Sequence, residues 1–378
     1  MPYPKIQMVD LIGQHTKIQS EIEQALLSAS RQGSYIQGPE VSAFAQELSI
    51  YLGEGVYTLP CANGTDALQI ALMALGLKPG DEVITATFTY VATAEVIALL
   101  GLKLVLVDVD PLTFGLNIDQ VRSAITSRTK AIVPVHLFGQ SVDMEPLMKL
   151  ASETGVYIVE DTAQALGARY TFSDGRRMAL GTIGVIGCTS FFPSKNLGCL
   201  GDGGALFTRD EELANKIRII SNHGQRLKYQ HILIGCNSRL DTIQAAVLRV
   251  KLAHLDQYEA ARKRAASYYD NGLAGIKGLT IPTRRLESTH VFNQYTLIVA
   301  DGNRDRLAEY LRSNGIPTMI YYPIPVHRQQ AYFSEAYSTN SFSVADQLCT
   351  EVLSLPMHTE LCIQSQDYII KKIKNFYA

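Results

Sequence analysis

Residues 130–161 read KAIVPVHLFGQSVDMEPLMKLASETGVYIVED, and this stretch decides the fold. An apolar run rich in Val and Ile opens it, a segment with helical spacing follows, and a second apolar run closes it. Two short strands joined by a helix form the unit from which parallel sheets are built. The stretch therefore predicts an α/β domain.

The same alternation extends in both directions along the chain. Apolar runs of this kind begin at residues 56, 82, 103, 183 and 204, with the sequences VYTLP, EVITA, KLVLVDV, IGVIGCTSF and GALFT. Helical patterns such as TDALQIALMALG lie between runs, and no internal repeat is visible, which excludes solenoids and propellers. We expect a large α/β domain with a mostly parallel sheet over residues 1–255.

The pattern changes at Asp241. One long helix is expected from there until Gly272 closes it, and it resembles a connector between domains. Beyond it, the sequence predicts one or two strands near residues 291–299, a helix ending at Gly315 and a short C-terminal helix. We therefore expect a smaller α+β domain over residues 256–378.

The charge balance argues against a nucleic-acid binder. The 378 residues carry 34 Lys and Arg against 36 Asp and Glu, a formal net charge of −2, without a dense basic block. The N-terminus has no basic segment followed by an apolar one, so we expect a cytoplasmic protein that does not contact a membrane. The six cysteines form no CxxC pair, so neither a metal site nor a disulfide framework is expected.

Two charged residues follow apolar runs, where ligands of open α/β sheets bind. Asp161 ends the run VYIVED and can face such a ligand, although it can equally cap a helix at TAQAL. Lys195, in SFFPSKNLG, follows another expected strand and precedes a glycine-rich turn. A lysine in a partly dehydrated site has a lowered pKa and a nucleophilic amine, whereas most lysines are solvated surface groups.

The turn after VYTLP offers an anion site. Asn63, Gly64 and Thr65 precede a helical pattern, so N–H groups and the helix dipole face an anion there, although an ordinary strand-to-helix turn has the same sequence pattern. Tyr90 follows another apolar run, where its ring can stack on a flat ligand or pack in the core. A lysine, a carboxylate and a phosphate cradle are the features that pyridoxal phosphate requires of a protein.

Six motifs carry a more specific resemblance. In chain order they are CANGTDAL (61–68), TFTYVATA (87–94), VEDTAQALGA (159–168), SFFPSKNLGCLGDGGA (190–205), GCNSRLDTIQAA (235–246) and YYPIPVHRQ (321–329). Together, across almost the whole chain, they resemble the DegT/StrS-type sugar aminotransferases. The resemblance implies a fold-type I aminotransferase that binds pyridoxal 5′-phosphate and forms a homodimer with active sites at the subunit interface.

The resemblance also implies a role for each matching residue. Lys195 matches the lysine that carries the cofactor as a Schiff base and moves protons, and Asp161 matches the partner of the pyridine nitrogen. Arg239 matches an arginine that can grip a carboxylate, and substrate contacts extend to Tyr322 and His327, although a structural role for His327 is equally compatible. The other cofactor-binding positions are Gln164 on the ring's hydroxyl side, Tyr90 as the stacking aromatic, Gly64, Thr65 and Ser190 at the phosphate, and Asn237 at the phosphate of the partner subunit.

The reaction implied by the resemblance is transamination of a nucleotide-linked keto-sugar, with L-glutamate as the expected donor. The motifs are most similar to the branch that aminates C3 of UDP-linked 2-acetamido-3-oxo-glucuronate for cell-surface polysaccharide or lipopolysaccharide biosynthesis. A dTDP-linked 3- or 4-keto-6-deoxyhexose is the alternative substrate. Lys195 stands where the family's dehydratase branch has histidine, which favours transamination.

A regulatory relative without catalysis is the alternative from another class of protein. Such a protein would need an added DNA-binding segment or a damaged site. Residues 1–40 are expected to hold one amphipathic helix, which is too little chain for a helix-turn-helix module. The sequence therefore favours the enzyme.

Overall fold

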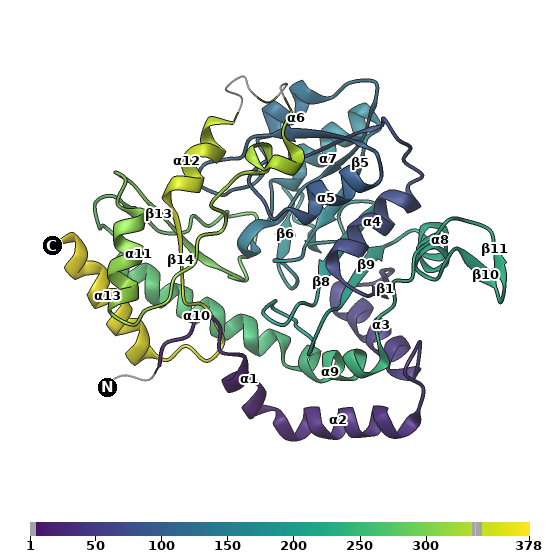
Figure 1. The fold of residues 1–378 in the computed structure, drawn as a ribbon, viewed down its shortest axis with the longest axis horizontal. Coiled ribbons are helices and arrows are strands. Elements are labelled where there is room, and N and C mark those ends of the chain that lie inside the picture. The colour runs from purple at the N-terminus through teal and green to yellow at the C-terminus, as the bar shows by residue number, and fades with distance from the viewer. Residues whose placement is uncertain (1–4, 335–336, 338–341) are drawn as a thin grey trace.

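Figure 1 shows the computed structural model of the chain, which describes residues 5–334, 337 and 342–378. A seven-stranded sheet with its helices forms the larger part, and a three-stranded sheet with helices forms the C-terminal part. The α-helices are α1 (Leu11–Lys17), α2 (Gln19–Gln32), α3 (Pro39–Leu52), α4 (Gly64–Ala74), α5 (Ala92–Leu99), α6 (Ile118–Ala124), α7 (Met144–Thr154), α8 (Glu211–Ser221), α9 (Thr242–Ala253), α10 (Leu255–Leu273), α11 (Arg304–Ser313), α12 (Ser343–Glu351) and α13 (Ile363–Tyr377). The strands are β1 (Tyr57–Cys61), β2 (Glu82–Ala86), β3 (Lys103–Val107), β4 (Thr129–Val133), β5 (Tyr157–Asp161), β6 (Arg169–Thr171), β7 (Arg177–Ala179), β8 (Ile186–Ser190), β9 (Gly204–Thr208), β10 (Gln225–Leu227), β11 (Gln230–His231), β12 (Leu279–Thr280), β13 (Tyr295–Val299) and β14 (Val352–Leu355).

The seven apolar runs of the sequence form the large sheet, in the order β1-β9-β8-β5-β4-β2-β3. The pairs β2–β3, β2–β4, β4–β5 and β5–β8 are parallel, whereas β9 is antiparallel to both β8 and β1. The prediction of a mostly parallel sheet is confirmed. Because only β9 is reversed, the carboxyl ends of the other six strands lie along one edge.

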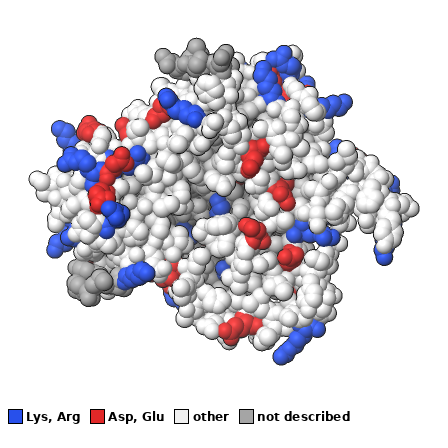
Figure 2. All heavy atoms as spheres, in the orientation of Figure 1, with Lys and Arg blue, Asp and Glu red and all other residues white. Residues whose placement is uncertain are grey.

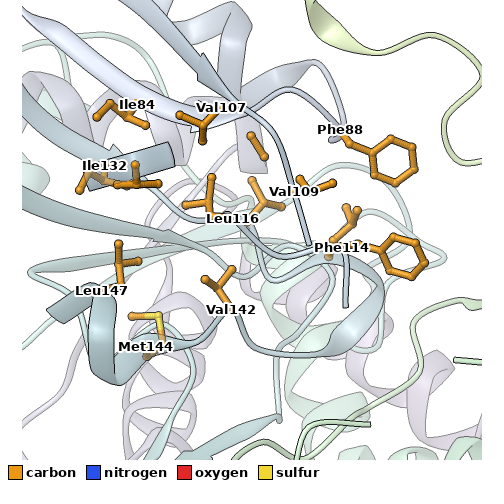
Figure 3. Close-up of a cluster of buried hydrophobic side chains, with 14 of the residues drawn as sticks. Ile84, Phe88, Val107, Val109, Phe114, Leu116, Ile132, Val142, Met144 and Leu147 are labelled. Atoms are coloured by element: carbon orange, nitrogen blue, oxygen red, sulfur yellow. The ribbon is translucent and has the colours of Figure 1, made fainter. Parts of the chain in front are cut away.

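Successive strand residues are buried on opposite faces of this sheet. Ile84 and Ile132 pack with Leu147 of α7 on one face, as Figure 3 shows. The adjacent Val83 and Ala131 belong to a second cluster with α4, α5 and α8 on the other face. A strand buried on both faces has an uninterrupted apolar sequence, which is why these strands could be recognised.

The long helix expected from Asp241 is two helices. The chain turns at His254, whose backbone N–H donates to the Lys251 carbonyl three residues back, and α10 begins at the next residue. The helix ends at Leu273, one residue after the expected end at Gly272, and this glycine lies in its last turn. A Cβ there would collide with the side chain of Ile370, so Gly272 permits close packing of α10 on α13.

The C-terminal part contains more helix and strand residues than the sequence predicts. Strand β14 pairs antiparallel with β13, which pairs in turn with β12. Neither β14 nor α12 was anticipated, and the C-terminal helix α13 has 15 residues rather than being short. The break at His254 lies next to the expected domain boundary at residue 255, which stays a prediction.

Two helices, α1 and α2, occupy the N-terminal residues where one was expected. The chain turns at Ile18, which is buried with Ile22 against Val247 of α9. This contact fixes α2 along α9 at the lower edge of Figure 1. Within the described residues, no helix is long and apolar enough to cross a membrane.

Candidate active site

The predicted site residues gather at the carboxyl edge of the large sheet. Asp161 is the last residue of β5 and Ser190 the last of β8, and these strands are neighbours. Gly64 and Tyr90 follow β1 and β2 by a few residues. Figure 2 shows a surface hollowed near its centre, with Lys or Arg atoms visible in the hollow.

Asp161 is a buried carboxylate with two hydrogen-bond donors. Thr93 Oγ1 donates to Asp161 Oδ2 over 3.0 Å, and Ala163 N donates to Oδ1 over 3.0 Å. Removal from water raises the pKa of this carboxyl, while both hydrogen bonds and the charge of Lys195 oppose the rise. Residues 163–167 form turns rather than a helix, so the helix-cap interpretation of Asp161 is wrong.

Lys195 lies in the turn after β8, half-buried and within reach of the charge of Asp161. Burial lowers the pKa of its amine to about 8, and Asp161 limits the fall by stabilising the ammonium. At pH 7 an amine with this pKa is neutral in about one molecule in ten, far more often than an ordinary lysine. The turn itself is fixed by a backbone hydrogen bond of 2.8 Å from Lys195 N to the Phe192 carbonyl.

The N-terminus of α4 forms a cradle beside Ser190. The Asn63 side chain caps the helix by accepting from Asp66 N over 2.8 Å, whereas the first N–H groups of any helix have no partner inside it. A Cβ at Gly64 would lie 2.7 Å from Ser190 Cβ, so only glycine lets this serine approach the helix end. Thr65 is the next residue of the helix, and the whole arrangement suits an anion.

The Gln164 amide joins three separate segments. Phe138 N donates to Gln164 Oε1 over 2.6 Å, and Gln164 Nε2 donates to the Tyr322 hydroxyl over 3.0 Å. Burial raises the pKa of that hydroxyl, and the charge of Asp161 adds to the rise. The Tyr90 ring centroid lies 6.1 Å from that of Tyr322, and Tyr90 is 57% exposed, which excludes a core role and leaves its ring accessible.

Asn237 and Arg239 do not join this group within their own chain. Asn237 is exposed and forms a backbone bridge with Asn222, and Arg239 is half-buried without an ion-pair partner among the described residues. No contact found in the described part of the chain links either residue to Lys195. Both follow a hairpin arm, residues 223–236, which contains β10 and β11 and projects from the body in Figure 1.

His327 is buried, at 6% exposure, and both of its ring nitrogens have partners. Its Nδ1 lies 2.7 Å from Thr87 Oγ1, and its Nε2 lies 3.3 Å from an oxygen of Asp346. Burial lowers the pKa of this imidazole. The surroundings therefore favour the structural alternative, in which His327 ties the segment before α12 to the end of β2.

Two groups in this cluster were not anticipated from the sequence. Thr93 lies in the first turn of α5, and only the packing of that helix brings its hydroxyl to Asp161. The Phe138 N–H belongs to a residue with a left-handed φ of 59°, a backbone conformation that side-chain patterns do not encode. A threonine after a strand is too common to signal such a role.

A cavity of about 790 Å³ lies elsewhere, between α2, α3 and α9. Its charged lining residues are Glu21, Glu40, Glu47 and Arg249, and Arg249 forms ion pairs with both Glu40 and Glu47. None of the predicted site residues lines this cavity. Its volume is therefore no indication of catalysis.

Comparisons with known proteins agree with the geometry. The sequence model of the DegT/DnrJ/EryC1/StrS aminotransferase family matches residues 16–374. UDP-2-acetamido-2-deoxy-3-oxo-D-glucuronate aminotransferase of Pseudomonas aeruginosa is 45% identical over 98% of this chain and 100% of its own length. A dTDP-3-amino-3,4,6-trideoxy-alpha-D-glucose transaminase of Streptomyces venezuelae is 41% identical over 95% of this chain and 92% of its own length.

The fold has equally clear counterparts among solved structures. The crystal structure of a DegT/DnrJ/EryC1/StrS aminotransferase from Brucella abortus has a TM-score of 0.93 to this chain at 41% identity. The match covers 99% of this chain and 100% of that one. The resemblance drawn from the six motifs and the fold-type I architecture that it implied are both confirmed.

Proposed function

This chain belongs to the DegT/DnrJ/EryC1/StrS aminotransferase family, and on that premise we propose that it moves the amino group of L-glutamate to C3 of a UDP-linked 2-acetamido-3-oxo-uronate. As an aminotransferase acting on nucleotide-linked keto-sugars, it makes an amino sugar. The observation that carries the proposal is the proximity of Lys195, with its lowered pKa, to the buried Asp161. The relative from P. aeruginosa supports the finer substrate, and the product would serve cell-surface polysaccharide or lipopolysaccharide synthesis.

The cofactor is pyridoxal 5′-phosphate, and the residues present fit it on three points. The cradle at Gly64, which a Cβ would fill, suits the phosphate. The buried Asp161 carboxylate suits a protonated pyridine nitrogen, and the lowered pKa of Lys195 suits attack on the aldehyde carbon. One cluster therefore holds a lysine, a carboxylate and a phosphate cradle for the cofactor.

Each side chain in this cluster has a separate task in the proposed reaction. When bound, the cofactor supplies an electron sink for the carbon from which a proton must leave. Lys195 takes that proton as general base and returns it as general acid, and Asp161 keeps a proton on the ring nitrogen that faces it. Tyr90 covers one face of the ring. The remaining contacts are proposed for Gln164 at the ring's hydroxyl side and for Gly64, Thr65 and Ser190 at the phosphate.

We propose Arg239 as the residue that recognises the uronate carboxylate. A guanidinium binds a carboxylate through two parallel hydrogen bonds, and Arg239 has no ion-pair partner in the described part of its own chain. Tyr322, beside Tyr90, is proposed as a second substrate contact. His327 is left out of the proposed site, because both of its ring nitrogens are already engaged.

The proposed site is completed by a second copy of the chain. The hairpin arm exposes apolar side chains, among them Tyr229 at 82% and Ile234 at 88%, and Phe192 beside Lys195 is also exposed. Clustered exposed apolar groups on a soluble protein indicate an interaction surface. In a homodimer, the arm would bring Asn237 and Arg239 to the phosphate and substrate of the partner's site.

The substrate is tested by assaying the enzyme with glutamate and three acceptors. These are UDP-2-acetamido-3-oxo-glucuronate, its counterpart with an uncharged C6 hydroxymethyl group, and a dTDP-linked keto-6-deoxyhexose. We expect the uronate to have the highest kcat/KM, and Arg239→Ala to raise its KM roughly 10- to 100-fold, the effect of losing hydrogen bonds to a charged group. Arg218→Ala, on the exposed part of α8, is the matched control. Equal kcat/KM for the uronate and its uncharged counterpart contradicts the proposed substrate.

Sharing of the site is tested by subunit exchange between two impaired proteins. Lys195→Ala protein is mixed with Asn237→Ala/Arg239→Ala protein, so that each mixed dimer contains one site with an intact lysine and an intact partner arm. Activity should rise above that of either parent protein, to about a quarter of the wild-type value after statistical exchange if the sites act independently. If mass spectrometry verifies exchange and activity does not rise, these residues serve their own chain.

A further inference from the structure

Glu160, the residue before Asp161, is a buried anchor on the opposite face of β5, because side chains alternate along a strand. Its carboxylate accepts from the backbone N–H groups of Gly181 at 2.8 Å, Ile183 at 2.7 Å and Gly184 at 2.7 Å. The fourth contact is His136 Nε2, 3.0 Å away. Four contacts on one buried carboxylate fix its position without a Lys or Arg partner in the described part of the chain.

The hydrogen bonds of His136 determine its tautomer. Val142 N donates to His136 Nδ1 over 3.1 Å, so Nδ1 is the acceptor and carries no proton. The ring proton of the neutral imidazole is then on Nε2, which faces Glu160. In addition, His136 N donates to the Asp161 carbonyl over 3.0 Å. Through its ring and its backbone, His136 thus ties both ends of segment 136–142 to β5.

Segment 136–142 in turn orients the Gln164 amide. Phe138, in its left-handed conformation, presents its N–H to Gln164 Oε1 at 2.6 Å. An amide whose oxygen is occupied by a donor must turn its NH₂ group to the other side, and here that group faces the Tyr322 hydroxyl at 3.0 Å. The direction of this amide therefore depends on where the Phe138 N–H is held.

We propose that His136, anchored by Glu160, is a positioning residue that keeps the NH₂ group of Gln164 directed into the active site. The inference rests on the proposed function, in which Gln164 faces the hydroxyl side of the cofactor ring. His136 and Glu160 touch neither cofactor nor substrate in this arrangement. Their effect on Gln164 passes through the backbone of segment 136–142, in which the Phe138 N–H makes the contact with the amide oxygen.

The test is a double-mutant cycle on the holoenzyme, read out by the pH dependence of the visible absorbance of the bound cofactor. Gln164→Leu removes the donor beside the ring oxygen and should raise the apparent pKa of that absorbance by about one unit, the consequence of losing one hydrogen bond to a charged group. His136→Gln keeps a donor for Glu160 but removes the acceptor of Val142 N–H, and it should shift the apparent pKa in the same direction. The double variant should shift it no further than Gln164→Leu alone.

Two further variants keep the test decisive. Thr85→Val removes another buried hydrogen bond, from Thr85 Oγ1 to the Val133 carbonyl at 2.9 Å, and should lower thermal stability without moving the absorbance profile. If His136→Gln does not fold, His136→Asn, which keeps an acceptor for Val142 N–H and loses the contact with Glu160, takes its place in the cycle. A wild-type profile in the folded His136 variant, or additive shifts in the double variant, overturns the proposal. Absence of any visible band from the wild-type protein would instead refute the proposed function.

Discussion

After incubation with excess pyridoxal phosphate and reduction with borohydride, Lys195→Ala protein is expected to carry no covalently bound cofactor and to have no measurable aminotransferase activity. The loss should be total, because covalent attachment and proton transfer both depend on this one amine. Mass spectrometry of the reduced protein and a glutamate half-reaction measure the two effects, and circular dichroism checks that the fold is retained. We expect the fold to tolerate the change, since Lys195 is only half-buried and forms no ion pair with any residue that the structure describes.

Lys251 offers a matched control for this experiment. It is also a buried lysine whose pKa is lowered by burial, but it lies on α9, and the charge that acts on it is that of Cys199 rather than of Asp161. Lys251→Met protein should therefore bind the cofactor and turn yellow like the wild type. Covalently bound cofactor in reduced Lys195→Ala protein, or its absence from folded and reduced Lys251→Met protein, contradicts the assignment of Lys195.

Asp161→Asn is expected to slow the glutamate half-reaction by roughly 10²–10⁴-fold while weakening cofactor binding much less. Asparagine has the shape of aspartate, and its single oxygen can still accept from Ala163 N while its NH₂ group donates to the Thr93 hydroxyl, but it lacks the charge that keeps the ring nitrogen protonated. Single-turnover absorbance changes give the rate, and equilibrium dialysis gives the affinity for the cofactor.

Asp108 provides the comparison for this variant. It too is a buried carboxylate that accepts backbone hydrogen bonds, in this case from Val344 and Ala345 at the start of α12. Asp108→Asn should reduce stability and leave the half-reaction rate per folded molecule unchanged. Near wild-type rates in Asp161→Asn protein would contradict a catalytic role for Asp161 and would mean that it only stabilises the turn that follows it.

The large sheet and the two central residues, Asp161 and Lys195, could be predicted from the sequence because each has a recognisable local pattern. Strands buried on both faces, such as β4 and β5, have uninterrupted apolar sequences, and each expected strand of the large sheet was found. Asp161 and Lys195 could be placed because they follow such strands directly. Their proximity could not be predicted from spacing alone, since it depends on β5 and β8 being neighbours.

The features that could not be predicted from the sequence depend on contacts between segments that are distant along the chain. The break at His254 arises from a shift in hydrogen bonding within an otherwise continuous helical pattern, and Gly272 is explained only by Ile370, almost a hundred residues later in the chain. The bond from Phe138 N to Gln164 requires one unusual backbone conformation. The engagement of His327 by Thr87 and Asp346 likewise joins segments that no local pattern connects.

The one reversed strand, β9, has a consequence for the order in which the molecule folds. It lies between β1 and β8, so it alone joins the strand before the Gly64 cradle to the strand before Lys195 within the sheet. Residues 57–61 must therefore wait for residues 204–208 before they can pair, and pairings over such long loops form slowly. Within the sheet, the strand before the Gly64 cradle and the strand before Lys195 are therefore joined only once β9 has paired with both. A cofactor site built on both of these strands thus depends on the pairing of a strand that contributes none of the proposed site residues.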